Sequence, residues 1–570
     1  MSGAPLGVDP ARPVSDTLDQ FFEHYFRRRP VNATFTGVHR YDALLPDWSV
    51  RALAAQRAEM VALHAELAAA HPAPPSESGY RDDVVSLDAE LARAFLEIQL
   101  AEDAGMHGVR GNPALWAGEA VFSIISLMIR DFAPFIDRVD LATARLDALP
   151  AFLDEAVEAA KEHAFPESWT TRALRDCQGA AILLTRGIER WLASGVCAPS
   201  QALLLRHAAD GASRAVERFV SMVRAHAALP DDAAACGPAL YDLLLRRGHM
   251  CNRSRAELLA NARVQLRAEQ ARLDAMAREH ADGWPDVQAR LAALHPVPDD
   301  YLESFARTWA ACRQTARAHD VVTWPDWPLR YTTIPECTRD AAPFLYYLFY
   351  RAPAPFDTYD VHDYVVPPLP AGDAEAHLRT WNSAAITLNH VVHHGAVGHH
   401  LQNWHAYHRA ASRVGTVAAV DCANRIGMFC GGTMAEGWAC YATQLMDELG
   451  FLSPLEQVSE QHSRVRFLAR AIVDMSFHEG SLSFHDAIAL FTTETGMDSS
   501  TARAEVVKCS MFPGTAIMYW LGTQSILELR AQRRRTQGSA FTLRAFHDEL
   551  LGYGSLPVPL VSRLMQARSS

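Results

Sequence analysis

Residues 389–408 read Asn-His-Val-Val-His-His-Gly-Ala-Val-Gly-His-His-Leu-Gln-Asn-Trp-His-Ala-Tyr-His, and the rest of the chain is organised around them. The stretch holds seven of the 25 histidines: His390, His393, His394, His399, His400, His405 and His408. Neutral imidazole is the commonest metal ligand and the side chain that titrates nearest physiological pH. A helix whose histidines are individually solvated or hydrogen-bonded is the alternative. The density of the cluster favours a metal site.

The spacing of these histidines predicts a helix with a bend. His390 and His394 are four residues apart and would share one face of an uninterrupted helix. His393 and His399 are six apart and would point in different directions unless the backbone bends. Gly395 and Gly398 lie between them and can supply such a bend, because glycine tolerates conformations that other residues avoid.

Outward from this stretch, apolar periodicity predicts a mostly α-helical protein with a few short strands. Thr17–Arg28 carries apolar residues at the spacing of one helix face. Further helices are predicted over residues 51–70, 80–104, 119–130, 141–163, 170–194, 200–228 and 253–281. We expect a large helical body around a central cleft.

Three sections differ in character along the chain. Residues 1–320 form a helical N-terminal region, and residues 321–380 are irregular and rich in proline and aromatic residues. This middle section could supply short strands and a loop that walls a pocket, although its aromatic side chains could equally belong to the core. Residues 381–570 return to helices and carry the candidate site. One continuous structural unit is expected.

Composition excludes several classes of protein. The net charge of −13 and the pI near 6.0 argue against a nucleic-acid-binding surface. The chain holds no apolar run of 18 residues, which argues against a membrane span. The first thirty residues lack the basic start and apolar core of a signal peptide, which predicts a cytoplasmic protein. The oligomeric state is left open, with a homodimer as one option.

Glu436 is the best carboxylate partner for the histidines. A mononuclear zinc or iron site usually takes two or three histidines and often one carboxylate. Glu436 stands in Met-Ala-Glu-Gly-Trp-Ala-Cys-Tyr, at the start of a predicted helix that runs to Leu449. A glutamate buried beside Trp438 and Tyr441 needs a charged partner, and a metal would be one. A glutamate stabilised by the helix dipole is the alternative.

Several ordered motifs resemble the bacterial family called domain of unknown function 885, which is related to the gluzincin metallopeptidases. That family's motif His-Glu-x-x-Pro-Gly-His-His-Leu-Gln corresponds to residues 393–402, and its Glu-Gly-Trp-Ala-x-Tyr to residues 436–441. Its Arg-x-x-x-Asp-x-x-x-His corresponds to Arg470, Asp474 and His478, and its Pro-Gly-x-Ala-x-x-Tyr-x-x-Gly to residues 513–522. The resemblance covers most of the chain and is strongest from about residue 380 onward.

The resemblance implies a role for each matching residue. The metal ligands would be His393, either His399 or His400, and Glu436. His478 would line the site, oriented by Asp474 one helical turn away. Tyr519 would stabilise a developing oxyanion. Arg470 would bind a substrate carboxylate, with an ion pair to a nearby acid as the alternative.

The chain departs from the family motif at its most important position. His394 replaces the glutamate that, in gluzincin chemistry, takes a proton from metal-bound water and delivers it to the leaving amine. Val397 replaces the motif proline. His394 could act as the base, or it could be a further ligand that closes the position needed by water.

Three functions remain after this departure. The first is a metal-dependent hydrolase of a peptide, amide or related small acyl substrate, with His394 or His478 in place of the lost base. The second is a metalloenzyme of small-molecule biosynthesis that performs lyase, isomerase or oxidative chemistry. The third is a catalytically inactive metal-binding protein. All three require one divalent metal, zinc first and iron second, because two histidines and one carboxylate suit either ion.

Overall fold

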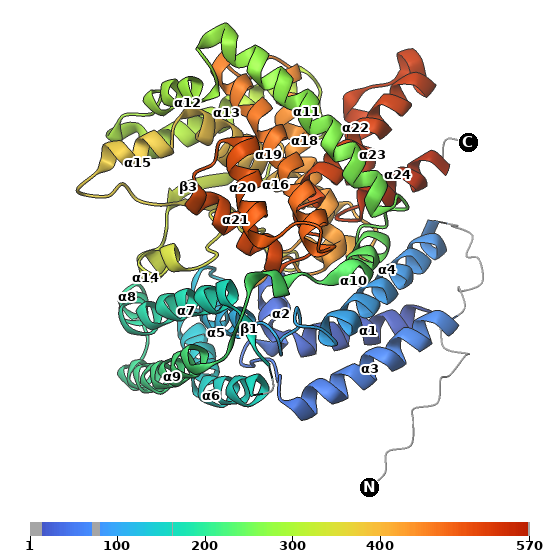
Figure 1. Ribbon diagram of the computed structural model, residues 1–570. Helices are drawn as coiled ribbons and strands as arrows, with labels where there is room; N and C mark the ends of the chain where they lie inside the picture. Colours follow the sequence, from blue (N-terminus) through green and yellow to red (C-terminus); the bar gives the residue numbers. More distant parts are fainter. Residues whose placement is uncertain (1–13, 71–79, 162, 568–570) are drawn as a thin grey trace.

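The computed structural model describes residues 14–70, 80–161 and 163–567. Figure 1 shows a body built almost entirely of helices, which confirms the predicted fold class. Among the described residues, strands appear as two short parallel pairs. β1 (Phe165–Pro166) pairs with β2 (Ala228–Leu229), and β3 (Leu329–Thr333) pairs with β4 (His362–Val366). The predicted short strands of the middle section are therefore present as β3 and β4.

The first section is helical as predicted. Its helices are α1 (Val14–Arg28), α2 (Pro30–Thr36), α3 (Val50–Ala69), α4 (Tyr80–Asp103), α5 (Pro113–Met128), α6 (Phe135–Ala160), α7 (Glu167–Ile182), α8 (Ile188–Ala193), α9 (Pro199–Ala225), α10 (Gly237–Leu243), α11 (Arg255–His280), α12 (Trp284–Ala293) and α13 (Tyr301–Ala318). Of these, α1, α3, α4, α9 and α11 follow their predicted ranges within a few residues, α5 and α6 begin six residues earlier than predicted, and α2, α10, α12 and α13 were not predicted. The apolar face predicted for α1 is buried from Leu18 to Phe26. In Figure 1 the blue and teal helices α1–α9 form the lower half of the molecule.

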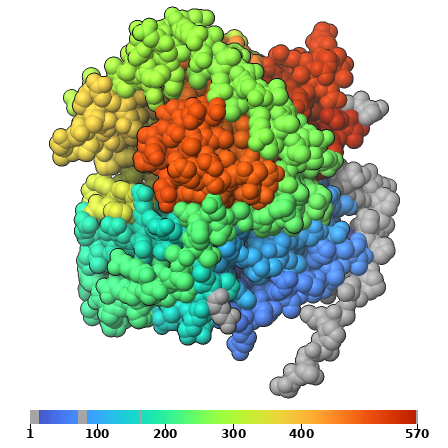
Figure 2. Space-filling view, viewed as in Figure 1, coloured from blue at the N-terminus to red at the C-terminus, as the bar shows by residue number. Residues whose placement is uncertain are grey.

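The second half of the chain forms the upper part of Figure 1. Its helices are α14 (Glu336–Arg339), α15 (Ala374–Thr380), α16 (His399–His408), α17 (Arg413–Val417), α18 (Gly432–Glu448), α19 (Pro454–His478), α20 (Phe484–Thr495), α21 (Ser499–Met511), α22 (Met518–Gln537), α23 (Leu543–Leu551) and α24 (Val558–Ala567). Figure 2 shows α20 and α21, in orange, seated on the surface between the green helices and the teal section below. In Figure 1 the labels of α18, α19 and α22 lie above and to the right of those of α20 and α21.

Short 3-10 and π-helical segments interrupt the α-helices. The 3-10 segments are η1 (His39–Tyr41), η3 (Asp231–Ala234), η5 (Pro298–Asp300), η6 (Ala342–Phe344), η8 (Phe429–Gly431) and η9 (Gly538–Ala540). The π-helical segments are η2 (Leu183–Gly187), η4 (Leu244–Gly248) and η7 (Ala385–Gly395). π-Helix is rare and often occurs at functional sites. The eleven-residue η7, which ends in the histidine motif, therefore marks a candidate functional site.

Hydrophobic clusters connect distant parts of the chain. One cluster joins Phe21 of α1 to Tyr364 of β4, Trp438 of α18 and Met565 of α24. Burial of apolar surface contributes about 25 cal/mol per Å² and is the main source of stability for such contacts. The middle section adds its aromatic side chains to the same cluster, since Tyr350 and Tyr364 are buried. The core interpretation of these two aromatic residues is therefore confirmed.

Candidate metal centre

The π-helix η7 and the turn after it place three histidines of the motif together. His393 and His394 are in the last turn of η7, and His399 is the first residue of α16. The turn is closed by hydrogen bonds from the Ala396 and Gly398 amides to the carbonyls of Val391 and Val392. This is the bend that the spacing of His393 and His399 required.

Gly398 is needed because of the close approach of the backbone in this turn. A Cβ atom at residue 398 would lie 1.8 Å from the carbonyl oxygen of His393. No side chain fits in that space. Two indole N–H groups from other helices bind the same turn. Trp309 donates to the Gly395 carbonyl at 2.7 Å, and Trp438 donates to the Val397 carbonyl at 2.8 Å. The sequence therefore builds a rigid support for the histidines.

Glu436 lies against two of these histidines. Its Oε2 is 3.3 Å from Nε2 of His393 and 3.5 Å from Nε2 of His399. Glu436 occupies an early turn of α18, and its side chain is 21% exposed. Two ligand atoms bound at about 2.0–2.2 Å to one tetrahedral zinc are separated by about 3.3–3.5 Å. The three side chains thus already stand at the separation of metal ligands.

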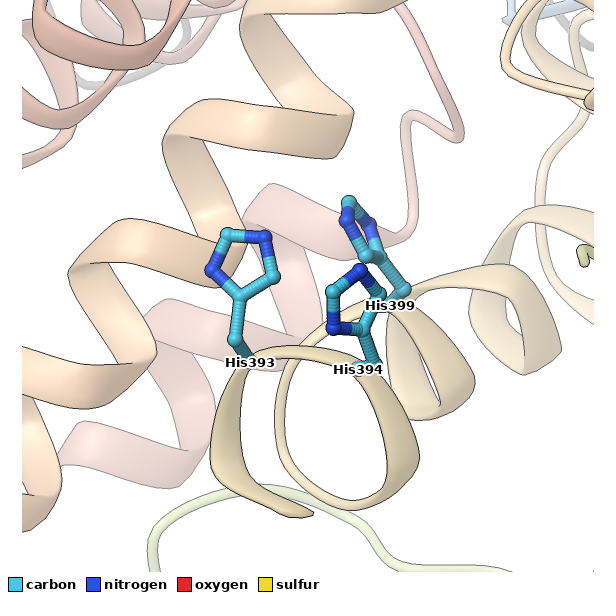
Figure 3. A group of neighbouring side chains, drawn as sticks. All are labelled: His393, His394 and His399. Carbon is cyan, nitrogen blue, oxygen red and sulfur yellow. The ribbon is translucent and has the colours of Figure 1, made fainter. Parts of the chain in front are cut away.

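His394 completes a triangle of imidazoles, as Figure 3 shows. One nitrogen from each of His393, His394 and His399 lies within 4.8 Å of the others. The Nδ1–H of His394 donates to the Asn389 carbonyl at 2.6 Å, which leaves Nε2 as an unprotonated acceptor. The three rings rise on the same side of the turn, so their nitrogens can share one ion.

Burial and mutual contact set the protonation of this cluster. Burial opposes ionisation of Glu436, but the imidazoles of His393 and His399 outweigh it and hold the pKa of Glu436 well below its usual value. Burial, followed by the neighbouring imidazoles, holds the pKa of His394 well below 6.5. Burial also lowers the pKa of His393. A carboxylate with neutral imidazoles is the state that divalent metals bind.

The other four histidines of the motif have separate hydrogen bonds. Nδ1 of His390 lies 2.6 Å from the Tyr364 hydroxyl. His405 donates to the Thr323 carbonyl, and His408 to the Trp404 carbonyl. His400 donates to the Trp327 carbonyl at 3.0 Å and stacks on the Trp327 ring. Of the two adjacent histidines, His399 is therefore the one that lies against Glu436, and His400 is engaged with Trp327 instead.

His478 and Asp474 lie in the core between helices and line no part of the cavity beside the cluster, which corrects the prediction that His478 lines the site with Asp474 orienting its ring. Both are fully buried. His478 accepts from the Cys236 amide and donates to the Cys509 carbonyl. Asp474 accepts from the amides of Gly514 and Ile517, each at 3.0 Å. Asp474 thus holds the turn before α22, and His478 ties α19 to α21.

Tyr519 lines the same cavity as Glu436, on a helix, α22, that crosses α18 very closely. A Cβ atom at Gly437 would lie 2.5 Å from the Cα atom of Gly522, and one at Gly522 would lie 2.1 Å from the Thr433 carbonyl. The crossing brings Tyr519 to the cavity wall beside Glu436. Burial, with Glu436 as a second cause, raises the pKa of Tyr519 well above 10, so its hydroxyl is a proton donor.

Arg470 lines the same cavity but is already engaged by an acid. Its guanidinium donates two hydrogen bonds to Glu505, one of them at 2.9 Å between Nε and Oε2. It also lies over the Tyr519 ring, 5.1 Å from the centroid. The ion pair that was the alternative for Arg470 is the arrangement found.

The candidate metal centre opens into a cavity of about 600 Å³. Its wall is made by residues from α12, η7, α18, α19, α21 and α22, and Leu348 of the middle section also contacts it. Two cations on this wall, Arg466 and Lys508, were missed in the sequence. The signal for Arg466 was its position four residues before Arg470 on a predicted helix. For Lys508 the sequence carries no comparable signal.

Comparisons with known proteins establish the family. The profile of the family described as "Bacterial protein of unknown function (DUF885)" matches residues 30–565. The chain belongs to this family. Among curated proteins, none matches the sequence.

Two solved structures share the fold. One is a "putative lipoprotein of unknown function" from Shewanella oneidensis, with a TM-score of 0.75 and 20% identity, covering 98% of this chain and 100% of that one. The other is a "putative lipoprotein" from Colwellia psychrerythraea, with a TM-score of 0.76 and 17% identity, covering 99% and 100%. At these identities the likeness shows the fold alone.

These descriptions contradict the expectation of a cytoplasmic protein, because lipoproteins are held at membranes by a covalently attached lipid. That expectation depended on the composition of residues 1–30, of which residues 1–13 lie outside the described part of the chain. Within the described ranges, every helix is too short or too polar to cross a bilayer.

Proposed function

We propose that the protein is a metal-dependent hydrolase of a peptide, amide or related small acyl substrate. The observation that carries the proposal is the donor set: two imidazole nitrogens, of His393 and His399, at 3.3 and 3.5 Å from one carboxylate oxygen of Glu436. His393 and Glu436 line a cavity of about 600 Å³. Small-molecule sites of enzymes commonly have cavities of this size.

The residues present fit a zinc ion. His393, His399 and Glu436 supply the two histidines and one glutamate found in catalytic zinc sites, which keep a further position open. A zinc ion held there would supply Lewis-acid activation of water and of a carbonyl oxygen. The resemblance to gluzincin metallopeptidases, made on the motifs at 393–402 and 436–441, points to the same ion.

His394 takes the position of the missing base in this proposal. Its Nδ1–H is fixed on the Asn389 carbonyl, so the lone pair of Nε2 is free to accept a proton from the attacking water. The protonated ring can then return that proton to the leaving amine. Tyr519 would donate its hydroxyl hydrogen to the carbonyl oxygen as negative charge develops there.

One observation favours a second candidate function. Two histidines and one carboxylate also form the ligand set of non-haem iron oxygenases. An iron-dependent oxidative enzyme acting on a small metabolite is therefore the alternative, and the identity of the metal separates the two.

Elemental analysis of the purified, tag-free protein tests the proposal. We expect about one zinc per chain in the wild type, and loss of the zinc in His393→Ala and Glu436→Ala. His408→Ala is the matched control, because His408 is exposed and bonds only to the Trp404 carbonyl in its own helix. One iron per chain would move the assignment to oxidative chemistry. No bound metal, even after reconstitution, would contradict both functions.

Activity is tested with a broad library of short peptides and acyl amides. The proposal predicts that some members are cleaved and that a chelator stops the cleavage. A library without any chelator-sensitive turnover would contradict a hydrolase even if zinc is bound.

A further inference from the structure

One face of α19 forms a long wall of the cavity. Ser459, Ser463, Arg466 and Arg470 all line it, at successive spacings of four, three and four residues. At 1.5 Å per residue, this face extends for about 16 Å. Arg466 stands one helical turn before Arg470, which lies over the ring of Tyr519. A substrate at the candidate metal centre would therefore extend along α19 past Arg466.

Arg466 differs from its neighbours on α19 because no ion pair joins it to any described residue. Arg464 is paired with Glu460, and Arg470 with Glu505. The Nε atom of Arg466 is buried and has no hydrogen-bond partner. A partly buried guanidinium without an anion is costly, and burial, followed by the charge of Arg470, lowers the pKa of Arg466 to about 10. The carboxylate of Glu505 lies near but is occupied by Arg470.

Lys508 brings a second unpaired cation to the same cavity. It occupies the last turn of α21 and is exposed, and no ion pair joins it to a described residue. Arg466 and Lys508 come from different helices, so an oxyanion in the cavity can be bound from two directions. Arginine presents a planar fork that matches a carboxylate, and lysine adds a point charge.

We propose that Arg466 and Lys508 form a subsite for the free carboxylate of the substrate. The substrate class is then a short peptide or N-acyl amino acid whose terminal carboxylate lies one or two residues beyond the bond that is cleaved. Residues four apart on a helix are about 5–6 Å apart, and one residue of extended chain spans about 3.3–3.6 Å. This assignment deepens the proposed function and depends on it for the position of the cleaved bond. Arg466 and Lys508 thereby take the role of binding the substrate carboxylate that the resemblance implied for Arg470, because Arg470 is paired with Glu505.

Binding of a matched pair of ligands tests the subsite. The probes are N-acetyl-dialanine with a free carboxylate and the same molecule with a C-terminal amide. Isothermal titration should show that the wild type binds the free acid at least tenfold more tightly than the amide. Arg466→Gln and Lys508→Gln should each reduce that preference about tenfold or abolish it. Arg535→Gln, which removes an exposed arginine of α22 outside the cavity, should leave it unchanged.

Amine acylation supplies a second readout, because the chain has two lysines, Lys161 and Lys508. The free acid should protect Lys508 from an N-hydroxysuccinimide ester. Lys161 should react at the same rate with or without ligand, since it is exposed and paired with Glu158 outside the cavity. Equal protection by the amide would overturn the subsite.

Other outcomes also overturn it. Equal binding of acid and amide to the wild type would do so, as would inorganic phosphate that binds more tightly than the free acid. A preference that survives Arg466→Gln but disappears in His393→Ala would place the carboxylate at the metal ligands instead. These are binding measurements, so a protein that binds the acid as expected but cleaves no peptide would contradict the proposed hydrolase and leave the subsite standing.

Discussion

His394 is the residue on which the chemistry of this protein depends most. It stands where the gluzincin-like motif that the sequence resembles has a glutamate, and its ring lies with those of His393 and His399 in a fixed tautomer. An imidazole in this position can be a base or a fourth protein ligand. These roles have different consequences, because a fourth protein ligand fills the position at which a tetrahedral zinc ion holds water.

We predict that His394→Ala retains the metal and lowers kcat by about 10²–10⁴, the usual contribution of a general base. His408→Ala should change neither quantity. Metal content and steady-state kinetics measure the two effects separately. Loss of the metal in His394→Ala would instead make His394 a ligand.

The variant His394→Glu separates an active enzyme from an inactive relative. Because a glutamate is the base in gluzincin chemistry, this variant should retain part of the wild-type turnover. A wild type without turnover, together with clear turnover by His394→Glu, would show that the natural protein has lost catalysis.

At the scale of elements, the crossing of α18 and α22 decides whether Tyr519 reaches Glu436. Two glycines make the crossing, and both belong to motifs visible in the sequence: Gly437 follows Glu436, and Gly522 is three residues after Tyr519. The motifs predicted that these glycines matter. Only the packing shows why glycine is needed at both positions. The backbone of α22 lies against Gly437, and the backbone of α18 lies against Gly522.

We predict that Gly522→Ala destabilises the protein by about 1–3 kcal/mol, since its Cβ would lie 2.1 Å from the Thr433 carbonyl. The displaced α22 should also lower kcat by moving Tyr519. Gly372→Ala is the control, because a Cβ there would meet nothing within 4 Å. Chemical unfolding and kinetics would check both variants, and equal stability of the two would contradict the close crossing.

At the scale of the whole molecule, the site is assembled from segments that are far apart in sequence. The cavity wall draws on residues from Trp284 to Tyr519, and the hydrophobic clusters draw on all three sections of the chain. The division at residues 320 and 380 remains a prediction. Burial on this scale also leaves many histidines neutral inside the protein, which affects stability at low pH.

Acid should destabilise the fold through these buried histidines. Burial lowers the pKa of five histidines to about 4: His24, His249, His400, His405 and His462. It lowers the pKa of three others to about 3: His390, His478 and His547. Their native pKa lies below the unfolded value of about 6.5, so unfolding takes up protons. Their contribution is complete above about pH 6.5 and is lost as the pH falls toward 4, with a slope of up to about 1.4 kcal/mol per pH unit for each group.

Acids whose pKa is raised by burial oppose this trend without cancelling it, and Glu119, Asp474 and Asp176 are the clearest of them. Burial raises the pKa of Glu119 and Asp474 to about 7 and that of Asp176 to about 6, so their contributions are lost as the pH rises. The net prediction is a lower denaturation midpoint in guanidinium chloride at pH 5 than at pH 7. His462→Gln should reduce this difference, whereas His485→Gln, at an exposed position, should not. A midpoint that rises at pH 5 would contradict the prediction.

The sequence by itself predicted most of the long helices and named the candidate ligands. Apolar periodicity is a local property, so α1, α3 and α4 were predicted nearly residue by residue. The spacing of His393 and His399 around two glycines already required the bend that brings them together. Glu436 could be chosen because few carboxylates stand in so apolar a helix start.

Only the tertiary structure decided which of the similar residues belong to the site. His400 and His399 are neighbours in sequence, but the carbonyl of Trp327, more than seventy residues away, accepts a hydrogen bond from His400. Arg466 and Arg470 are one turn apart on α19, but Glu505 on α21 pairs with Arg470 alone. Such choices depend on partners from distant segments, whose positions are set by packing rather than by local pattern. For that reason the sequence predicted a group of candidate donors, and the structure was needed to show which of them lie together.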